Sequence, residues 1–274
     1  EAADAAKRCL SYFQGATAPG VSRDQRYMRF IVPEDRRRAY DMRNIIETLA
    51  DEGSVLELRG GWGAGIITSF IRIAGRPVGV VANNPRHLGG AVDADGSDKA
   101  ARFVQLCDNF GVPVVMLCDT PGIMVGPEAE KTAIMRRSSR LIVAAANARV
   151  PVFTIITRKA YGIGMMAMMA GAPKAPVFNV AWPTAEYGGM GFEGAVQLGY
   201  RREMEAIEDE AERKRFFDAK VAELYEGGKA LTRITSYEFD DVIDPADTRA
   251  WILAGLEAAS GVVARQHHPF VSTW

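Results

Sequence analysis

Short runs of apolar, β-branched residues recur along the chain and predict buried strands. Three of them are separated by Gly and Pro and lie at residues 55–58, 66–73 and 78–82. The segment Gly75-Arg76-Pro77 between the last two predicts a hairpin turn. Three further runs alternate with helical patterns and lie at residues 114–117, 152–157 and 177–181. Continuous apolar strands that alternate with helices predict a parallel sheet covered on both faces.

Helical spacing of apolar positions marks the segments between and around these strands. Residues 2–13, 40–49, 129–148, 201–225 and 248–259 show it, as do a segment capped by Ser97 and a segment that follows Gly164. In the segment after Ser97 one face carries apolar side chains, Gly111 is a suitable C′ residue, and Pro113 prevents continuation.

Two segments differ from this pattern. Residues 14–38 are rich in Gly, Pro and Arg and predict a linker, and residues 201–225 are strongly charged. The charged helix has two interpretations: a solvated surface, or an arm that packs on a neighbouring subunit.

Composition excludes several functional classes. Of 274 residues, 48% are hydrophobic and 24% are charged, which are globular values. Lys plus Arg is 33 and Asp plus Glu is 34, so the chain has no basic field for nucleic acid or an anionic membrane. Three Cys and three His form no ligand cluster, so we expect no metal site and reduced thiols in a cytoplasm-like compartment. The chain shows no signal-peptide pattern, and its apolar runs are too short to cross a bilayer. Because residue 1 is Glu and not Met, we expect either a processed piece or one segment of a longer polypeptide.

Four loops at predicted strand ends are candidates for chemistry, because α/β sheets place ligands there. They cover residues 88–93, 118–122, 158–164 and 181–191. In the third, Gly162 and Gly164 precede a helix, whose first N–H groups are free and lie at the positive end of its dipole. This arrangement predicts an oxyanion hole without a charged side chain, with an ordinary turn as the alternative.

Common catalytic motifs do not occur. The chain has no phosphate-binding G-x-x-x-x-G-K-[ST] loop, no G-x-G-x-x-G that opens a βαβ unit, and no G-x-S-x-G elbow. His87 is a lone loop histidine, for which a surface role is the better interpretation. The methionines at 165, 166, 168 and 169 are interpreted as core residues, with contact to an acyl chain as the alternative.

At these loops the sequence resembles the carboxyltransferase component of biotin-dependent acyl-CoA carboxylases. The matching segments occur in the family's order and cover nearly the whole chain. They are Tyr40-Asp41-Met42-Arg43, residues 75–83, residues 98–103, Asp119-Thr120-Pro121-Gly122, residues 157–162, residues 181–186 and residues 240–245.

The resemblance implies an α/β fold, a crotonase-like ββα-spiral domain, and it extends only to the second half of the family's length. Residues 1–38 then form a helix and linker from the end of a preceding domain, and residues 39–274 form the C-terminal, biotin-side carboxyltransferase domain. No Met-Lys-Met biotinylation motif and no ATP-binding carboxylase occur. Biotin, as carboxybiotin, must therefore arrive on another domain or chain. The implied partners are acyl-CoA, biotin carboxyl carrier and biotin carboxylase domains or subunits, and the N-terminal carboxyltransferase domain, in a hexamer in the cytoplasm or mitochondrial matrix.

The family's chemistry assigns roles by motif. Carboxybiotin loses CO2, backbone N–H groups hold the ureido oxygen, and the acyl-CoA enolate takes up CO2. The matching donors are the N–H groups of Ile163 and Gly164. Biotin-binding residues are Tyr161, Gly162, Gly189, Met190 and Gly191, and residues of the substrate pocket are Met166, Pro121, Gly122, Gly89 and Gly90.

Two loops depart from the family pattern. The family commonly reads Tyr-Gly-Gly-Ala-Tyr-Asp where this chain has Tyr161-Gly162-Ile163-Gly164-Met165-Met166, so Met166 replaces a polar residue associated with acyl-chain choice. The family's Ile-Ala-Val-Met-Gly is here residues 187–191. Propionyl-CoA specificity therefore does not follow. Two other functions stay open: a biotin-dependent decarboxylase α subunit that runs the same site in reverse, and a non-catalytic assembly segment.

Overall fold

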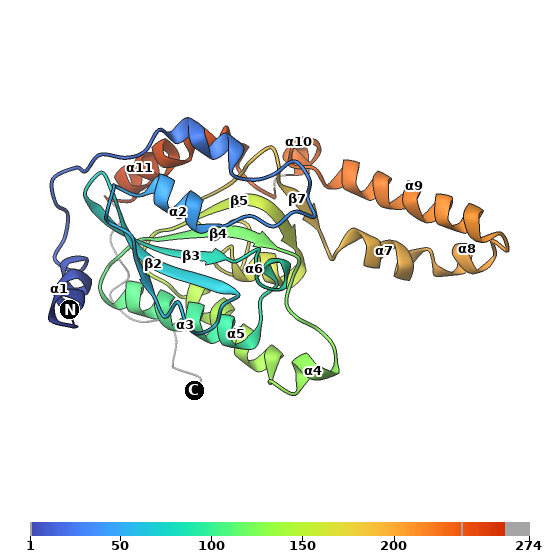
Figure 1. Cartoon of the computed structure of the whole chain (residues 1–274), viewed down its shortest axis with the longest axis horizontal. Helices are drawn as coiled ribbons and strands as arrows, with labels where there is room; N and C mark the ends of the chain where they lie inside the picture. The colour runs from blue at the N-terminus through green and yellow to red at the C-terminus, as the bar shows by residue number, and fades with distance from the viewer. Residues whose placement is uncertain (1, 237, 261–274) are drawn as a thin grey trace.

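A computed structural model describes residues 2–236 and 238–260, and within them a single eight-stranded sheet forms the centre of the fold (Figure 1). Its strands follow the order β1-β2-β3-β4-β5-β6-β8, and β7 pairs with the far end of β5. The strands are β1 (Leu56–Leu58), β2 (Ile66–Ile73), β3 (Arg76–Asn83), β4 (Val114–Thr120), β5 (Val152–Tyr161), β6 (Phe178–Ala181), β7 (Glu186–Gly188) and β8 (Asp241–Val242).

The α-helices of the described residues are α1 (Ala2–Ser11), α2 (Arg43–Leu49), α3 (Ala94–Asn109), α4 (Pro127–Glu130), α5 (Ile134–Ala146), α6 (Gly162–Ala167), α7 (Phe192–Gly199), α8 (Arg201–Glu205), α9 (Glu210–Gly228), α10 (Ala230–Arg233) and α11 (Thr248–Ala259). Short 3-10 helices are η1 (Gln25–Phe30), η2 (Leu88–Gly90), η3 (Ile234–Ser236) and η4 (Pro245–Asp247).

The strand pairing confirms the predicted sheet. β1, β2 and β3 are antiparallel neighbours, whereas β3, β4, β5 and β6 run parallel. The predicted hairpin exists, but its turn was placed too far along the chain. Ile73 pairs with Arg76, so the two turn residues are Ala74 and Gly75, with φ of 50° and 77°. Pro77 lies inside β3, opposite Arg72.

Helices cover both faces of the sheet, as the continuous apolar strands predict. On one face α3 and α5 pack, and buried Phe70, Phe103 and Met116 belong to that core (Figure 1). On the other face lie α2 and α11, with buried Trp182 and Ile252 in a second core. The parallel strands are buried on both sides, which explains why their sequences do not alternate.

Several helix boundaries differ from the predictions. α3 begins at Ala94, because the side chain of Asp93 rather than Ser97 accepts the N-terminal hydrogen bond. The helix predicted for residues 129–148 is broken at Ala133, whose φ is 56°, into α4 and α5. The helix predicted to follow Gly164 begins at Gly162. The linker also holds a 3-10 turn, with Met28 buried.

The charged segment predicted as one helix forms part of an arm. α7 and α8 lead away from the sheet, and α9 brings the chain back to α10 beside it (Figure 1). The predicted helix over residues 201–225 is interrupted between α8 and α9. Tyr200 and Phe216 meet edge to face between the two sides of the arm, with ring centroids 6.0 Å apart. None of the described helices is both long and apolar enough to span a bilayer.

Gly255 in α11 offers a test of the packing on the second face. A Cβ atom there would lie 2.6 Å from Phe153 and 2.8 Å from Phe178. We expect Gly255→Ala to destabilise the protein by about 1–3 kcal/mol through overpacking, although alanine is the better helix former. Gly227 in α9 has open space around it, so Gly227→Ala should stabilise by about 0.5–1 kcal/mol. Denaturant unfolding measures the change in the free energy of unfolding for both variants. Changes of the same sign would contradict the close packing of α11.

Candidate active site at the carboxyl ends of the parallel strands

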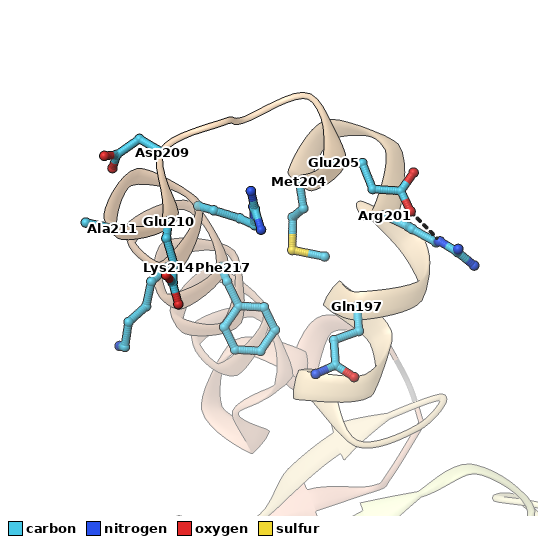
Figure 2. A pocket seen from close by; sticks show the side chains of 10 residues that line it. Gln197, Arg201, Met204, Glu205, Asp209, Glu210, Ala211, Lys214 and Phe217 are labelled. Atoms are coloured by element: carbon cyan, nitrogen blue, oxygen red, sulfur yellow. Dashed lines mark hydrogen bonds and ion pairs between the residues drawn. The ribbon is translucent and has the colours of Figure 1, made fainter.

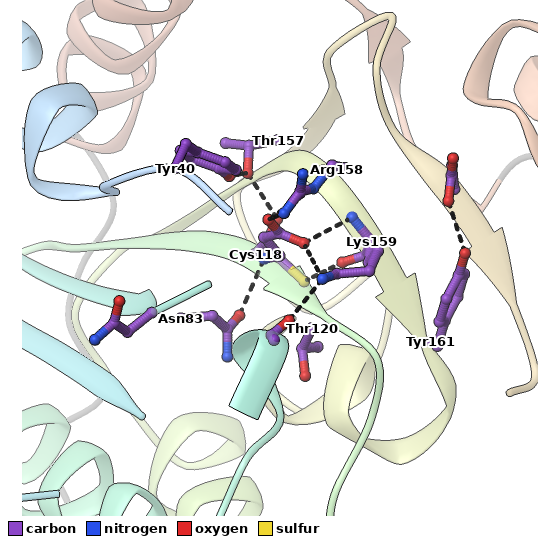
Figure 3. Close-up of polar contacts among 12 residues, drawn as sticks. Tyr40, Asn83, Cys118, Thr120, Thr157, Arg158, Lys159 and Tyr161 are labelled. Atoms are coloured by element: carbon purple, nitrogen blue, oxygen red, sulfur yellow. Dashed lines mark hydrogen bonds and ion pairs between the residues drawn. The ribbon is translucent and has the colours of Figure 1, made fainter. Parts of the chain in front are cut away.

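The predicted site residues gather at one edge of the sheet. β3, β4 and β5 are parallel, so their carboxyl ends at Asn83, Thr120 and Tyr161 lie along the same edge (Figure 3). The loop after β4 carries Pro121 and Gly122, and α6 follows β5 without an intervening residue. The topology therefore brings together loops that are far apart in the sequence.

The start of α6 touches two of these loops through bare backbone. A Cβ on Gly164 would lie 2.7 Å from the Cα of Gly122. Gly162 has φ of 55°, and a Cβ on it would lie 2.8 Å from the carbonyl oxygen of Gly189. Any side chain at either position would force the loops apart. Four residues predicted for the site are thus brought together in pairs.

α6 presents its N-terminus at this edge. The N–H groups of its first residues have no acceptor within the helix, and the helix dipole adds partial positive charge there. Ile163 is 49% exposed and Met166 is 38% exposed. Solvent therefore reaches α6 at Ile163 and Met166, whereas Gly164 between them is buried.

A fully buried carboxylate lies directly behind this edge (Figure 3). Asp119 Oδ2 accepts from Nε of Arg158 at 3.1 Å and lies 3.0 Å from its Nη2. Asp119 Oδ1 accepts from the backbone N–H of Lys159 at 3.1 Å and lies 3.4 Å from its Nζ. The backbone N–H of Asp119 donates to Oδ1 of Asn83. These bonds join the ends of β3, β4 and β5.

Residues of the linker close over this ion pair. The backbone oxygen of Arg38 accepts from Nη1 of Arg158 at 2.8 Å, and the guanidinium lies 4.8 Å from the centre of the Tyr40 ring. Tyr40 Oη is 2.9 Å from Oγ1 of Thr157 (Figure 3). Burial, with the charge of Asp119 as a second cause, raises the pKa of Tyr40 well above its usual value. Tyr40 therefore remains a neutral phenol and contributes a structural contact.

Tyr161 points away from the helix start. Its hydroxyl donates to Oε2 of Glu186 at 2.7 Å, and its ring packs on Phe192 with centroids 5.2 Å apart. Burial, together with the charge of Glu186, raises its pKa, so the hydroxyl stays a donor at neutral pH. The whole residue is 3% exposed, so the side chain of Tyr161 is closed to a ligand.

The Gly89-Gly90 segment lies against the same carboxylate. A Cβ on Gly90 would lie 2.1 Å from the backbone oxygen of Asp119, and Nζ of Lys159 donates to the backbone oxygen of Gly89 at 2.6 Å. The backbone oxygen of Gly122 accepts from the N–H of Val92. The two loops assigned to the substrate pocket are therefore neighbours.

The methionines divide into two groups. Met168 and Met169 are fully buried beyond the end of α6, which confirms the core interpretation for them. Met166 and Met190 are exposed by 38% and 43% and remain available to a ligand or a partner.

Sequence reasoning gave no role to Asp119, Arg158, Lys159 or Glu186. All four lie in segments that carry the resemblance, but nothing in the sequence states which charges pair across strands. His87 was predicted as a surface residue; it is 3.1 Å from Asp93, which caps α3. Within residues 2–236 and 238–260 no group of three or more His, Cys, Asp and Glu side chains could hold a metal ion.

A separate cavity lies in the arm (Figure 2). Its volume is about 880 Å³, and side chains of Met204 and Phe217 point into it. Its lining comes from α7, α8, α9 and the loop before α9, and contains none of the predicted site residues. This cavity and the glycine-lined edge are thus different places.

Comparison with known proteins gives consistent matches. The carboxyl transferase domain family matches residues 1–266. The methylmalonyl-CoA carboxyltransferase 12S subunit of Propionibacterium freudenreichii subsp. shermanii is 39% identical over 232 residues, which cover 84% of this chain and 43% of that protein. The biotin-dependent long chain acyl-coenzyme A carboxylase beta4 subunit of Mycobacterium tuberculosis (strain ATCC 25618 / H37Rv) is 41% identical over 223 residues, covering 80% of this chain and 42% of that subunit.

Solved structures show the same fold. A single-chain, multi-domain long-chain acyl-CoA carboxylase aligns with a TM-score of 0.84 and 53% identity, over 91% of this chain and 24% of that one. The hexameric transcarboxylase 12S aligns with a TM-score of 0.84 and 34% identity, over 98% of this chain and 52% of that one. The crotonase-like α/β fold is thereby confirmed. The chain spans less than half the length of the curated relatives that it matches.

Proposed function

The chain belongs to the carboxyl transferase domain family, and on that premise we propose that it supplies the biotin-side half of an acyl-CoA carboxyltransferase site. The observation that carries the proposal is the start of α6, where Ile163 is exposed and the backbone of buried Gly164 is pressed against Gly122. The reaction class is the transfer of a carboxyl group from carboxybiotin to the α-carbon of an acyl-CoA.

The residues at this edge fit the cofactor. A ureido oxygen that gains negative charge needs hydrogen-bond donors and no nearby anion. The N–H groups of Ile163 and Gly164 are such donors, and the open space beside Gly189 and Gly191 would let a flat ring approach the backbone. Met190 offers an exposed apolar side chain beside them. Bound carboxybiotin would supply the CO2 and the ureido group that accepts the proton.

This chain's residues then act by orientation and electrostatics. The two N–H groups stabilise charge as it develops on the oxygen, aided by the dipole of α6. Gly122 fixes the position of the helix start, and the hydrogen bond from Tyr161 to Glu186 fixes the end of β5 that leads into it. The mechanism requires no catalytic histidine or carboxylate from this half.

The other half of the site is proposed to come from elsewhere in the assembly. An N-terminal carboxyltransferase domain would bind acyl-CoA, and biotin carboxylase and biotin carrier domains or subunits would deliver carboxybiotin. α1 has no buried residue, which supports its assignment to the end of a preceding domain, with residues 39–274 as the C-terminal domain. The reduced cysteines support a cytoplasmic or mitochondrial-matrix location. The reverse reaction of a decarboxylase would use the same donors.

Removal of one N–H donor tests the proposed oxyanion hole. Gly164→Pro is unsuitable alone, because any side chain there collides with Gly122. Ile163 is exposed and lies in the first turn of α6, where proline is tolerated. We expect Ile163→Pro to lower kcat by about 10²–10³-fold, measured as decarboxylation of a malonyl-CoA-type substrate with free biotin by the complete protein.

Ile163→Ala is the control, since it keeps the amide and should retain most of the activity. Circular dichroism of both variants reports folding. Near-normal turnover of a folded Ile163→Pro variant would rule out this donor.

The exposed side chain of Met166 predicts the acyl-chain preference. If Met166 lines an open pocket, each further methylene of the acyl tail adds about 0.8 kcal/mol of binding, or about fourfold in kcat/KM. The measurement compares acetyl-, propionyl-, butyryl- and longer acyl-CoA with the complete enzyme. Met166→Asp should flatten this dependence, because a carboxylate beside an apolar tail is costly to bury. Met168→Leu, in the core, should leave it unchanged. A steep preference for acetyl-CoA would contradict the open pocket.

Because this chain is proposed to supply only half of the site, we predict that the active protein is an obligate assembly. Exposed apolar side chains at Ile163, Met190 and Leu198 lie on the segments around the site and the arm. We expect the complete protein to form a hexamer built from dimers, with the loop of Gly189, Met190 and Gly191 at a contact. Sedimentation at micromolar concentration measures the mass. An active monomer would contradict the proposal, and an inert, folded assembly would favour the non-catalytic alternative.

A further inference from the structure

The turn at residues 88–90 has an unfavourable backbone conformation. Leu88, Gly89 and Gly90 have φ of 48°, 62° and 92°, so three consecutive residues lie in the left-handed region. Glycine adopts that region freely, but leucine does not. The side chain of Leu88 is 52% exposed, so packing of this side chain does not fix the turn. Other contacts must hold it.

Those contacts come from Asp119 and Lys159. The backbone oxygen of Asp119 lies so close to Gly90 that a Cβ there would be 2.1 Å away. From the other side, Nζ of Lys159 donates to the backbone oxygen of Gly89 at 2.6 Å. The same Nζ lies 3.4 Å from Oδ1 of Asp119. The turn is thus held between the backbone of one residue and the ammonium of another.

We propose that Lys159 is a positioning residue that holds the Leu88–Gly90 turn in place beside the subsite that this chain contributes to the substrate pocket. The assignment of that subsite rests on the proposed function, whereas the restraint of the turn rests on geometry alone. A hydrogen bond from a charged donor is short and strong, and the 2.6 Å distance is in keeping with this.

The two carboxylate oxygens of Asp119 contact different cations, which explains why Lys159 can hold the turn. Arg158 occupies Oδ2, and its guanidinium also donates to the backbone of Arg38. Oδ1 is left for the backbone N–H and the ammonium of Lys159. The buried carboxylate keeps its charge balanced by Arg158 if Lys159 is replaced. Loss of the Lys159 ammonium should therefore free the turn without unfolding the sheet.

Hydrogen exchange of the complete protein tests the restraint without reference to activity. The N–H groups of His87, Gly90 and Ala91 make the turn's own hydrogen bonds, so a peptide covering residues 86–92 reports its opening. In Lys159→Met we expect exchange of this peptide to accelerate by about tenfold. Lys174→Met is the matched control, since it breaks an exposed ion pair with Asp240 and should leave the peptide unchanged. Unchanged exchange in a folded Lys159→Met variant overturns the proposal.

A second variant tests the same turn by changing its strained residue, Leu88. Asparagine tolerates the left-handed region better than leucine, and Leu88 contributes little packing. Leu88→Asn should slow exchange of residues 86–92 in otherwise unchanged protein, and should reverse part of the acceleration in the double variant with Lys159→Met. This measurement also tests the proposal if Lys159→Met fails to fold. If Leu88→Asn leaves the exchange of residues 86–92 unaltered, the turn holds no strain for Lys159 to restrain, and the proposal is overturned.

Kinetics separate positioning from direct catalysis. A displaced turn should raise KM for acyl-CoA by about tenfold while kcat changes less than about threefold, and Lys159→Arg should restore most of the loss. A large fall in kcat with normal KM and normal exchange would make Lys159 a reacting group instead and overturn the proposal. If the unaltered complete protein transfers no carboxyl group, the proposed function fails, but the exchange result stands by itself.

Discussion

Asp119 is a carboxylate with no exposed surface, and the geometry of the candidate site depends on how its charge is satisfied. An unpaired charge in that position would be prohibitively costly. Its partners are consecutive residues at the end of β5, so satisfying the charge aligns β4 with β5 at the edge where the chain leaves the sheet. Asn83 adds the end of β3 through the backbone of Asp119. Replacement of Asp119 would leave Arg158 buried without its partner and disturb all three strand ends.

Close contacts between backbones position α6 relative to these aligned strand ends. α6 has only six residues, too few to hold its own orientation, so its direction follows from its neighbours. Gly164 against Gly122, and Gly162 against Gly189, set the helix start within a narrow range of positions. Donors aimed in advance at developing charge are effective because they need no reorganisation during the reaction. Glycines thus serve here as spacers of minimum size, and the functional atoms belong to the main chain.

The sequence predicted the architecture more completely than it predicted the site. Continuous β-branched runs identified the parallel strands, because strands buried on both faces cannot alternate. Boundaries were less visible: Asp93 and Ser97 are both good caps, and the break at Ala133 follows no Gly or Pro signal. The resemblance located the glycine loops, whose meeting at one edge is confirmed. It could not reveal the pairing of Asp119 with Arg158 and Lys159, because charge pairing across strands depends on register. The roles assigned to Ile163, Gly164 and the biotin-contacting residues stay predictions.

The central claim is that the backbone at the start of α6 binds the ureido oxygen of biotin. A structure of the complete assembly with biotin bound tests it most directly. The account predicts that oxygen at about 3 Å from the backbone nitrogens of Ile163 and Gly164, with the ring beside Gly189 and Gly191. Biotin bound instead in the arm cavity between α7 and α9, with the N–H groups of α6 turned to water, would contradict the account.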